Sequence, residues 1–397
     1  MFLPAMQRIS FWIILIAALY VSSLAYATDQ TAASAVKAAP ATKTPPALTE
    51  KPVPHIALLL PLKSTAFGQA ADAVRQGFLA AAGYQSQSLP VRVYESADEN
   101  SDIIEIYRQA VAAGARAVVG PLTRRGVAVL AGYPDISVPT LALNIVEGKG
   151  ADNLFSFGLT AELEARQIAR LAASTGLQTA FIISNGTPLS KRLSQTFAEE
   201  WNRQGGRIDR EILYQGDPAL LTDLPAADGG MVFLAVDAET AHLVRPYLNR
   251  SLPVYATSQI FNGNSATLIN YDLNGVHFID MPWLLQPDHP AVMVYPRANP
   301  PLEPEMERLY ALGIDAFRLL KIIMDGSYRS SLPLDGITGT IHLNAHQQFL
   351  REGIPAQFWH GRGLTPEEIA IEEATLAAAK AASGVSPVSP PTSTQAQ

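Results

Sequence analysis

The stretch HIALLLPL at residues 55–62 is a continuous apolar run, and a segment with helical spacing follows it directly. A strand that is buried on both faces of a parallel sheet has this unbroken apolar character. The apolar residues that follow recur every three or four positions and share one helix face: Phe67, Ala71, Val74, Phe78 and Ala82. The two segments therefore predict a strand followed by a crossover helix, the repeating unit of an α/β fold.

The same alternation continues along the chain. Strand-like runs lie at 91–96, 117–122, 140–144, 154–159, 179–185, 211–215, 231–236, 254–260, 275–280, 336–344 and 356–361. Helical patterns lie between them at 101–113, 161–174, 188–204, 238–248 and 304–325. Regular alternation of this kind is typical of parallel sheets with right-handed crossovers. We therefore expect doubly wound α/β architecture, with enough chain for two lobes.

The two ends of the chain have the composition of processing and linker segments. Residues 1–27 combine Arg8, a long apolar run and a final Ala-Tyr-Ala, the order of a cleavable signal peptide, although a retained membrane anchor is the alternative. Residues 28–53 and 385–397 are rich in Ala, Thr, Ser and Pro and predict disordered segments. Between them, a capping box formed by Thr365 and Glu368 opens a predicted C-terminal helix at 365–384.

Composition excludes several classes of function. The sequence contains no cysteine, so it offers neither disulfides nor a thiol for lipid attachment, and we expect no lipid anchor. The net charge of −7 is unlike the basic footprint of a nucleic-acid-binding protein. The mature chain should be a soluble, exported protein.

Catalytic and metal-binding patterns find little support. No G-x-S-x-G, H-E-x-x-H or P-loop motif occurs. His342 and His346 have the spacing of metal ligands on a helix, but they fall at the end of a predicted strand, where that spacing does not converge. Asp237 and Asp280 each follow a strand and are interpreted as turn residues rather than a catalytic pair. We expect no enzyme activity, no metal and no cofactor.

Two consecutive arginines stand at an electrostatically unfavourable place. Thr123, Arg124 and Arg125 follow the strand at 117–122 and open the next helix. A helix N-terminus carries positive potential, so cations in its first turn reduce stability. The arginines could attract an anion, contact acidic groups of a partner protein, or face solvent. Pairing inside the chain, with Glu147 or Asp152, is a further alternative.

The loops at the carboxyl ends of the strands are the expected place for a ligand, because open α/β sheets bind ligands in that crevice. Small hydroxyl groups and free amides at helix starts bind carboxylates in solute-binding proteins. The candidates of suitable type are Ser64, Thr65, Thr123, Arg124, Asn144, Asn185, Asp237 and Ser258. For the hydroxyl residues, helix capping is the competing interpretation.

Five blocks together resemble a known family. They are HIALLLPL with FGQAADAVRQGFLAAAG (67–83), AVVGPLTRRGVAVLA (117–131), VPTLALN (138–144), NLFSFGLTAELEARQIA (153–169) and GITGTIHLNAHQQFLREGIPAQFWHGRG (336–363). The set resembles the C-terminal domain of LpoA-type (LppC family) activators of penicillin-binding proteins. The resemblance implies a type I periplasmic binding-protein fold with two lobes joined by three crossovers. It places the N-lobe at 54–160 plus 262–328 and the C-lobe at 161–261 plus 329–364.

The resemblance favours one function and leaves another open. It implies a non-enzymatic periplasmic regulator that binds a bifunctional, class A penicillin-binding protein and stimulates peptidoglycan synthesis. The alternative is a solute-binding component of a transporter for an amino acid or similar anion, with a small molecule between the lobes. Candidate partner contacts are Arg124, Arg125, and the large apolar residues Trp283 and Tyr295 in the proline-punctuated segment 281–296, although burial against a lobe is the alternative for these two.

Overall fold

The computed structural model describes residues 51–85, 89–145, 148, 150–222, 224, 229–264 and 267–382. The expected signal peptide, the expected linker up to residue 50 and the expected tail at 385–397 lie outside the described residues. Glu147, one of the acids considered for the arginine pair, lies outside them as well.

The first described sheet contains the strand that opens the sequence pattern. Its strand order is β11 (Leu334–Gly336), β12 (Gly339–Leu343), β13 (Gln348–Glu352), β5 (Leu154–Phe157), β4 (Thr140–Ala142), β3 (Ala115–Val119), β1 (His55–Leu60) and β2 (Val91–Glu95). From β13 to β2 all neighbours are parallel, whereas β11, β12 and β13 pair antiparallel. The continuous apolar run of β1 is fully buried, as the sequence predicts.

The second described sheet repeats this plan. Its order is β15 (Arg362–Leu364), β14 (Ile354–Trp359), β10 (Val276–Asp280), β9 (Val254–Ala256), β8 (Gly230–Ala235), β6 (Thr179–Ser184) and β7 (Arg207–Leu213). The strands from β10 to β7 are parallel, and β14 and β15 add an antiparallel edge. Each lobe therefore has a parallel sheet that is extended by strands from the C-terminal part of the chain.

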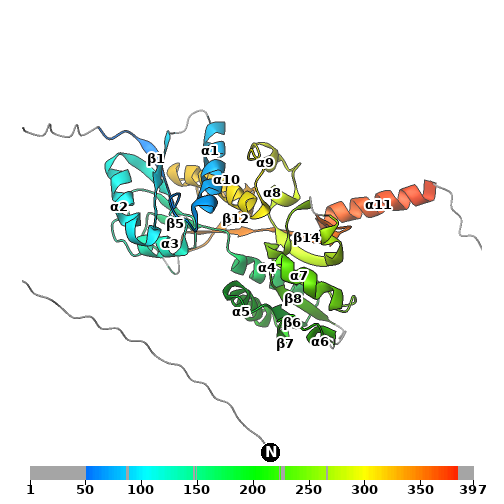
Figure 1. The fold of residues 1–397 in the computed structure, drawn as a ribbon. Coiled ribbons are helices and arrows are strands. Elements are labelled where there is room, and N and C mark those ends of the chain that lie inside the picture. The colour runs from blue at the N-terminus through cyan, green and yellow to red at the C-terminus, as the bar shows by residue number, and fades with distance from the viewer. Residues whose placement is uncertain are drawn as a thin grey trace, which may run out of the picture. The chain divides into compact units, whose positions relative to one another are not determined.

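Helices cover both faces of both sheets, which confirms doubly wound lobes (Figure 1). In the first lobe, α1 (Gly68–Tyr84) and α10 (Pro304–Met324) cover one face, and α2 (Glu99–Ala112) and α3 (Arg124–Ala131) the other. In the second lobe, α4 (Ala161–Ser174) and α5 (Pro188–Arg203) cover one face, and α7 (Ala238–Val244) the other. Alternation along the strands supplies both cores: Ile56 and Leu58 face α1, while Ala57 and Leu59 face α2.

Helices α1 and α10 pack at very close range because each has a glycine at the contact. A Cβ on Gly77 would lie 1.9 Å from the carbonyl oxygen of Tyr310, and one on Gly313 would lie 2.2 Å from that of Val74. Two backbones can approach this closely only where neither helix carries a side chain. The long helix predicted at 304–325 is thus a central packing element of the N-lobe.

The expected lobe boundaries need correction. Strand β10, expected in the N-lobe, belongs to the second sheet, and the segment at 334–352, expected in the C-lobe, supplies β11 to β13 of the first sheet. The N-lobe therefore combines residues up to β5 with α10 and β11–β13, and the C-lobe combines α4 to β10 with β14 and β15. The predicted single strand at 336–344 is a hairpin, because Gly336 pairs with Gly339 across a tight turn.

The chain passes between the lobes at three places, after β5, after β10 and after β13, as the expected three crossovers require. The shorter helical elements are α6 (Ala219–Thr222), α8 (Pro282–Leu285), α9 (Pro290–Met293), η1 (Arg245–Tyr247), η2 (Ser258–Ile260) and η4 (Ile269–Leu273). The segment at 281–296, expected as a loop, thus contains two short helices.

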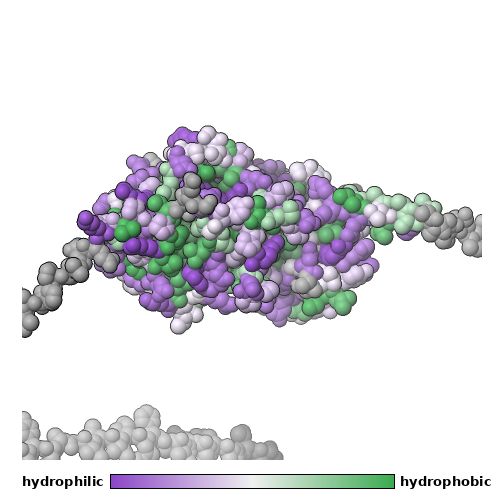
Figure 2. Space-filling view, turned by 90° about the horizontal axis from the view of Figure 1, so that it is seen from above, coloured by the Kyte–Doolittle hydropathy of each residue, from purple (hydrophilic) through white to green (hydrophobic). Residues whose placement is uncertain are grey.

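The C-terminal helix α11 (Pro366–Ala382) begins at the predicted capping box. The Thr365 hydroxyl accepts a hydrogen bond from the Glu368 amide, and the Glu368 carboxylate accepts one from the Thr365 amide. Beyond its first turns α11 is exposed along most of its length (Figures 1 and 2). Within the described residues, no helix combines the length and the apolar character needed to cross a lipid bilayer.

Candidate functional site

The start of α3 is occupied by a carboxylate of the protein itself. Glu99 is buried, and its two carboxylate oxygens accept hydrogen bonds from the amides of Leu122 (3.0 Å) and Thr123 (2.7 Å). The Thr123 hydroxyl accepts a further bond from the Gly126 amide, which is the N-cap geometry. Thr123 is therefore a capping residue, and the anion-binding position at this helix start is already filled.

Burial of the Glu99 carboxylate carries a desolvation cost, because its charged form is removed from water. Burial raises the pKa of the Glu99 carboxyl, and its hydrogen bonds with Leu122 and Thr123 oppose that rise. Gly126 makes the approach possible, because a Cβ there would lie 2.7 Å from the Cβ of Glu99. Glu99 carries no local signal of this role in the sequence, because it precedes its partners by more than twenty residues.

The C-lobe candidates also bond to one another. The Asn185 amide nitrogen donates to Asp237 (3.0 Å) and Thr240 (3.3 Å), and its oxygen accepts from Thr187. Asp237 is the N-cap of α7 and accepts from the Thr240 amide. The polar groups at these helix starts cap local structure.

Three further crevice candidates do not meet: Ser64 and Thr65 are neighbours in the loop after β1, and Ser258 follows β9 of the other sheet. The Ser64 hydroxyl accepts a long hydrogen bond from the Phe67 amide at 3.4 Å, and Thr65 is exposed. Ser258 is buried, and its amide donates to Glu164. The structure does not bring these residues into one pocket.

Arg124 bonds across to the C-lobe. Its guanidinium donates to Glu162, in the first turn of α4, at 2.8 Å, and Arg192 of α5 donates to the same carboxylate oxygen at 2.8 Å. Burial acts to raise the pKa of Glu162, but the hydrogen bonds from Arg124 and Arg192 outweigh it, so the pKa lies below its ordinary value. The position of Glu162 in the first turn of α4 is also one where the helix dipole favours an acidic residue. Arg125 is exposed and has no hydrogen bond or ion pair with any residue that the structure describes.

Trp283 is a core residue, which excludes it as an exposed partner contact. It is fully buried, and its indole nitrogen donates to Glu307 of α10. The Arg297 guanidinium lies over its ring at 3.7 Å. Tyr295 is half-buried, with its ring edge against the exposed Tyr84.

A second set of ion pairs joins the lobes in the interior. Arg308 of α10 donates to Asp280 of β10 at 2.6 Å, and to the carbonyl oxygens of Ser258 and Phe261. Glu164 of α4 pairs with Arg351 of β13. Asp280 is thus a buried structural carboxylate, and Asp237 lies elsewhere as a cap. The sequence offered no local signal for these pairs, because their members are far apart along the chain.

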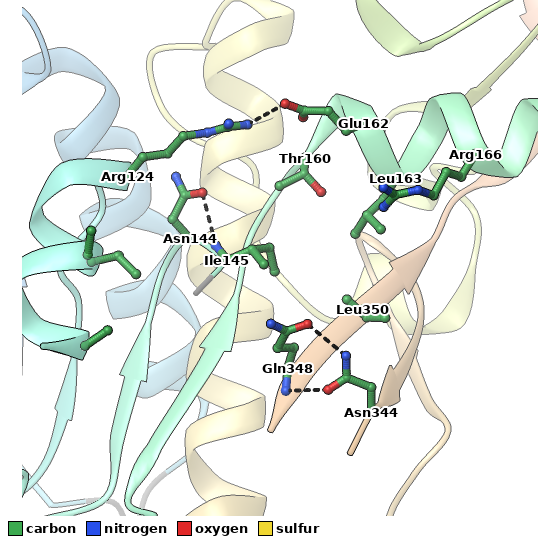
Figure 3. Close-up of a pocket in the computed structure, with 13 residues that line it drawn as sticks. Arg124, Asn144, Ile145, Thr160, Glu162, Leu163, Arg166, Asn344, Gln348 and Leu350 are labelled. Atoms are coloured by element: carbon green, nitrogen blue, oxygen red, sulfur yellow. Dashed lines mark hydrogen bonds and ion pairs between the residues drawn. The ribbon is translucent and has the colours of Figure 1, made fainter. Parts of the chain in front are cut away.

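One pocket of about 650 Å³ lies along α3 beside the first turns of α4 and the β12–β13 hairpin (Figure 3). Its lining residues are Arg124, Val127, Ala128, Ala131, Asn144, Ile145, Thr160, Glu162, Leu163, Arg166, Asn344, Gln348 and Leu350. Among the crevice candidates, Arg124 and Asn144 meet here, and the other six do not line this pocket. Within the described part of the chain, no three His, Cys, Asp or Glu side chains lie together in a way that could hold a metal ion.

Comparison with known proteins agrees with this architecture. The family model described as "LppC putative lipoprotein" matches residues 26–226 and 222–361. The chain is 26% identical over 310 residues to the penicillin-binding protein activator LpoA of Glaesserella parasuis, covering 75% of this chain and 52% of that protein. The corresponding values for LpoA of Haemophilus influenzae are 27% over 324 residues, 78% and 54%. The chain thus spans about half the length of these relatives.

Solved structures show the same fold. The C-domain of LpoA from Haemophilus influenzae, described as a regulator of PBP1A, has a TM-score of 0.66 at 23% identity and covers 78% of this chain. A "putative branched-chain amino acid ABC transporter" from Chromobacterium violaceum has a TM-score of 0.66 at 40% identity, covering 76% of this chain and 99% of that one. The family is described as lipoproteins, so the expectation of a chain without a lipid anchor is withdrawn. By the extent of the family match, this chain belongs to the LppC family.

Proposed function

We propose that this protein is a non-enzymatic periplasmic regulator that binds a class A penicillin-binding protein and stimulates its synthesis of peptidoglycan. Membership of the LppC family supports the proposal, as do relatives named penicillin-binding protein activators. These relatives are about twice as long as the matched region, so a penicillin-binding protein is proposed here as the partner of this chain.

The observation that carries the proposal is the occupied start of α3. A solute-binding site needs convergent polar groups that are free to meet the ligand. Here the amides of Leu122 and Thr123 bond to Glu99, and Arg124 bonds to Glu162 across the lobes. A ligand carboxylate at this helix start would have to displace a buried glutamate. A regulator that acts through its outer surface needs no such site.

Arg125 is the candidate contact that remains available on that surface. It is exposed and lacks an internal partner among the described residues, and it stands at a helix start where a cation reduces stability. We infer that it steers an acidic surface of the partner toward the N-lobe. Steering charges act mainly on the association rate and lose their effect at high salt.

The test measures both binding and stimulation. The mature chain is added to the purified class A penicillin-binding protein of the same organism, and association kinetics and the rate of glycan polymerisation are recorded. We expect binding, faster polymerisation, and slower association for Arg125→Glu at low salt. Arg210→Glu, at an exposed position of β7, is the matched control and should leave association unchanged. Lack of any binding or stimulation would overturn the proposal.

Transport of a branched-chain amino acid is the second candidate, favoured by the description of the Chromobacterium violaceum protein. Leucine, isoleucine and valine should be screened by thermal shift. A ligand at a hundred times its dissociation constant stabilises a protein by about 2.7 kcal/mol, which a melting curve detects. A clear upward shift with one of these amino acids would favour transport over regulation.

A further inference from the structure

The pocket along α3, called here the flank pocket and defined by the lining residues given above, takes no part in the proposed regulation. Its volume of about 650 Å³ lies within the range of small-molecule sites. It adjoins the start of α3 through Arg124, but neither Glu99 nor Thr123, which occupy the anion-binding position there, lines it. Its walls come from α3, from the first turns of α4 and from the β12–β13 hairpin (Figure 3).

Two polar groups in the flank pocket have no partner in the described chain. Thr160 is only 9% exposed, and its hydroxyl forms no hydrogen bond, although the residue stands at the N-cap position of α4. Arg166, one turn into α4, is half-buried and forms no hydrogen bond or ion pair with a described residue. In Figure 3 the Arg166 guanidinium extends from α4 toward Thr160, whose hydroxyl oxygen is buried at the pocket wall. A buried hydroxyl without a partner costs stability, so its retention points to a ligand.

The charges around the pocket favour an anion. Glu162 is the acidic residue of the lining. One of its carboxylate oxygens accepts from Arg124 and from Arg192 outside the pocket, and the other is buried without a partner among the described residues. Arg166 is therefore a cation that no described acidic residue balances. A guanidinium beside a hydroxyl donor is a suitable receptor for a carboxylate.

The remaining walls suit a short peptide. Apolar side chains line it from two sides: Val127, Ala128 and Ala131 from α3, and Leu163 and Leu350 from α4 and β13. The side-chain amides of Asn144 and Asn344 each donate one hydrogen, to Leu122 and to Gln348, so each keeps a second N–H that no described residue accepts. Such donors can bond the carbonyl oxygens of a peptide backbone.

We propose that the flank pocket binds the C-terminus of a short apolar peptide, with Arg166 and Thr160 holding its carboxylate and the α3 wall receiving its apolar side chains. This site is independent of the proposed partner contact at Arg125. It would give the protein a ligand besides any partner protein.

The experiment uses calorimetric titration of the mature chain with N-acetyl-alanyl-leucine, with its C-terminal amide, and with hexanoate. We expect the free acid to bind and the amide to bind at least about tenfold more weakly, because the charge-assisted bonds to Arg166 and Thr160 are lost. Hexanoate, which lacks peptide groups, should also bind more weakly than the free acid. Equal binding of hexanoate would overturn the peptide assignment.

Variants locate the binding. Arg166→Gln should weaken the free acid about tenfold and abolish the preference over the amide. Thr160→Val should weaken it several-fold with an unchanged or higher melting temperature, since it removes an unbonded buried hydroxyl. Arg170→Gln, one turn further along α4 and outside the lining, is the matched control and should bind like the wild type. No binding of the free acid up to about 10 mM, or binding unaffected by Arg166→Gln, would overturn the proposal.

Discussion

Two of the ion pairs that join the lobes have similar lengths, and one lies in the interior while the other lies at the surface. Arg308 and Asp280 approach to 2.6 Å with side chains that are 9% and 0% exposed. Arg124 and Glu162 approach to 2.8 Å with side chains that are 54% and 17% exposed. The first cation also binds two backbone carbonyls, whereas the second shares its acid with Arg192.

The difference shows that geometry alone does not set the energetic weight of an ion pair. At the surface, water solvates each partner almost as well as the pair does, so the interaction contributes about 0–1 kcal/mol. In the interior, water does not solvate either charge, so each is stabilised by its partner. Removing one partner leaves the other as an uncompensated buried charge. We therefore expect the interior pair to fix the relative position of the lobes, and the surface pair to contribute little.

The largest effect should come from Arg308→Met. It leaves Asp280 as a buried charge with a hydrogen bond from the Met281 amide but without its cation, and it frees the carbonyls of Ser258 and Phe261. The free energy of unfolding, measured by urea denaturation, should fall by about 3–5 kcal/mol. Adding Asp280→Leu in the same chain should restore part of the loss. A loss below about 1 kcal/mol for the single variant would contradict the comparison.

A smaller loss is expected for Glu99→Gln, which tests a buried carboxylate bonded to amides rather than to a cation. Glutamine keeps the shape but presents one donor where the glutamate has two acceptors. One of the amides of Leu122 and Thr123 then loses its partner in the interior. The free energy of unfolding should fall by about 1–3 kcal/mol. The exposed Glu105→Gln on the same helix serves as the control and should change it little.

These variants also mark where prediction from sequence ends. The continuous apolar run predicts β1, and the apolar stripe predicts α1. Both predictions succeed because the spacing of apolar residues within a short segment shows whether it is buried on one face or on two. The lobe expected for β10 was wrong, and β13 was not predicted as a strand. Both failures arise because sheet membership depends on pairing with strands that are distant in the sequence. Glu162 and Glu164 are both acidic residues in the first turn of α4. The first pairs with Arg124, and the second pairs with Arg351, which lies 187 positions away in the sequence. Only the assembled fold separates their roles.

His277 is a half-buried base and offers a contrast with the ion pairs. Burial of the imidazole lowers its pKa below the ordinary value. As the pH decreases, the imidazole is therefore protonated in the unfolded chain at a higher pH than in the folded protein. The free energy of unfolding is unaffected by this group above about pH 6.5 and falls as the pH decreases below that value. His277→Phe keeps a ring beside Tyr255, whose ring centroid lies 4.9 Å away, and should flatten the melting temperature between pH 7 and about pH 5. An unchanged pH profile would contradict this assignment.

The smallest effects concern the two adjacent arginines, and they should differ in sign. Arg124→Gln breaks the bond to Glu162, which keeps Arg192, so the free energy of unfolding should fall by at most about 1 kcal/mol. Arg125→Gln removes an unpaired cation from a helix start and should raise it by roughly 0.3 kcal/mol. Both changes should shrink in about 1 M salt, because screening acts on exposed charges and spares buried ones. The loss caused by Arg308→Met should persist in the same salt. If the Arg124 effect proved as large and as resistant to salt, the surface pair would hold the lobes as firmly as the interior pair does.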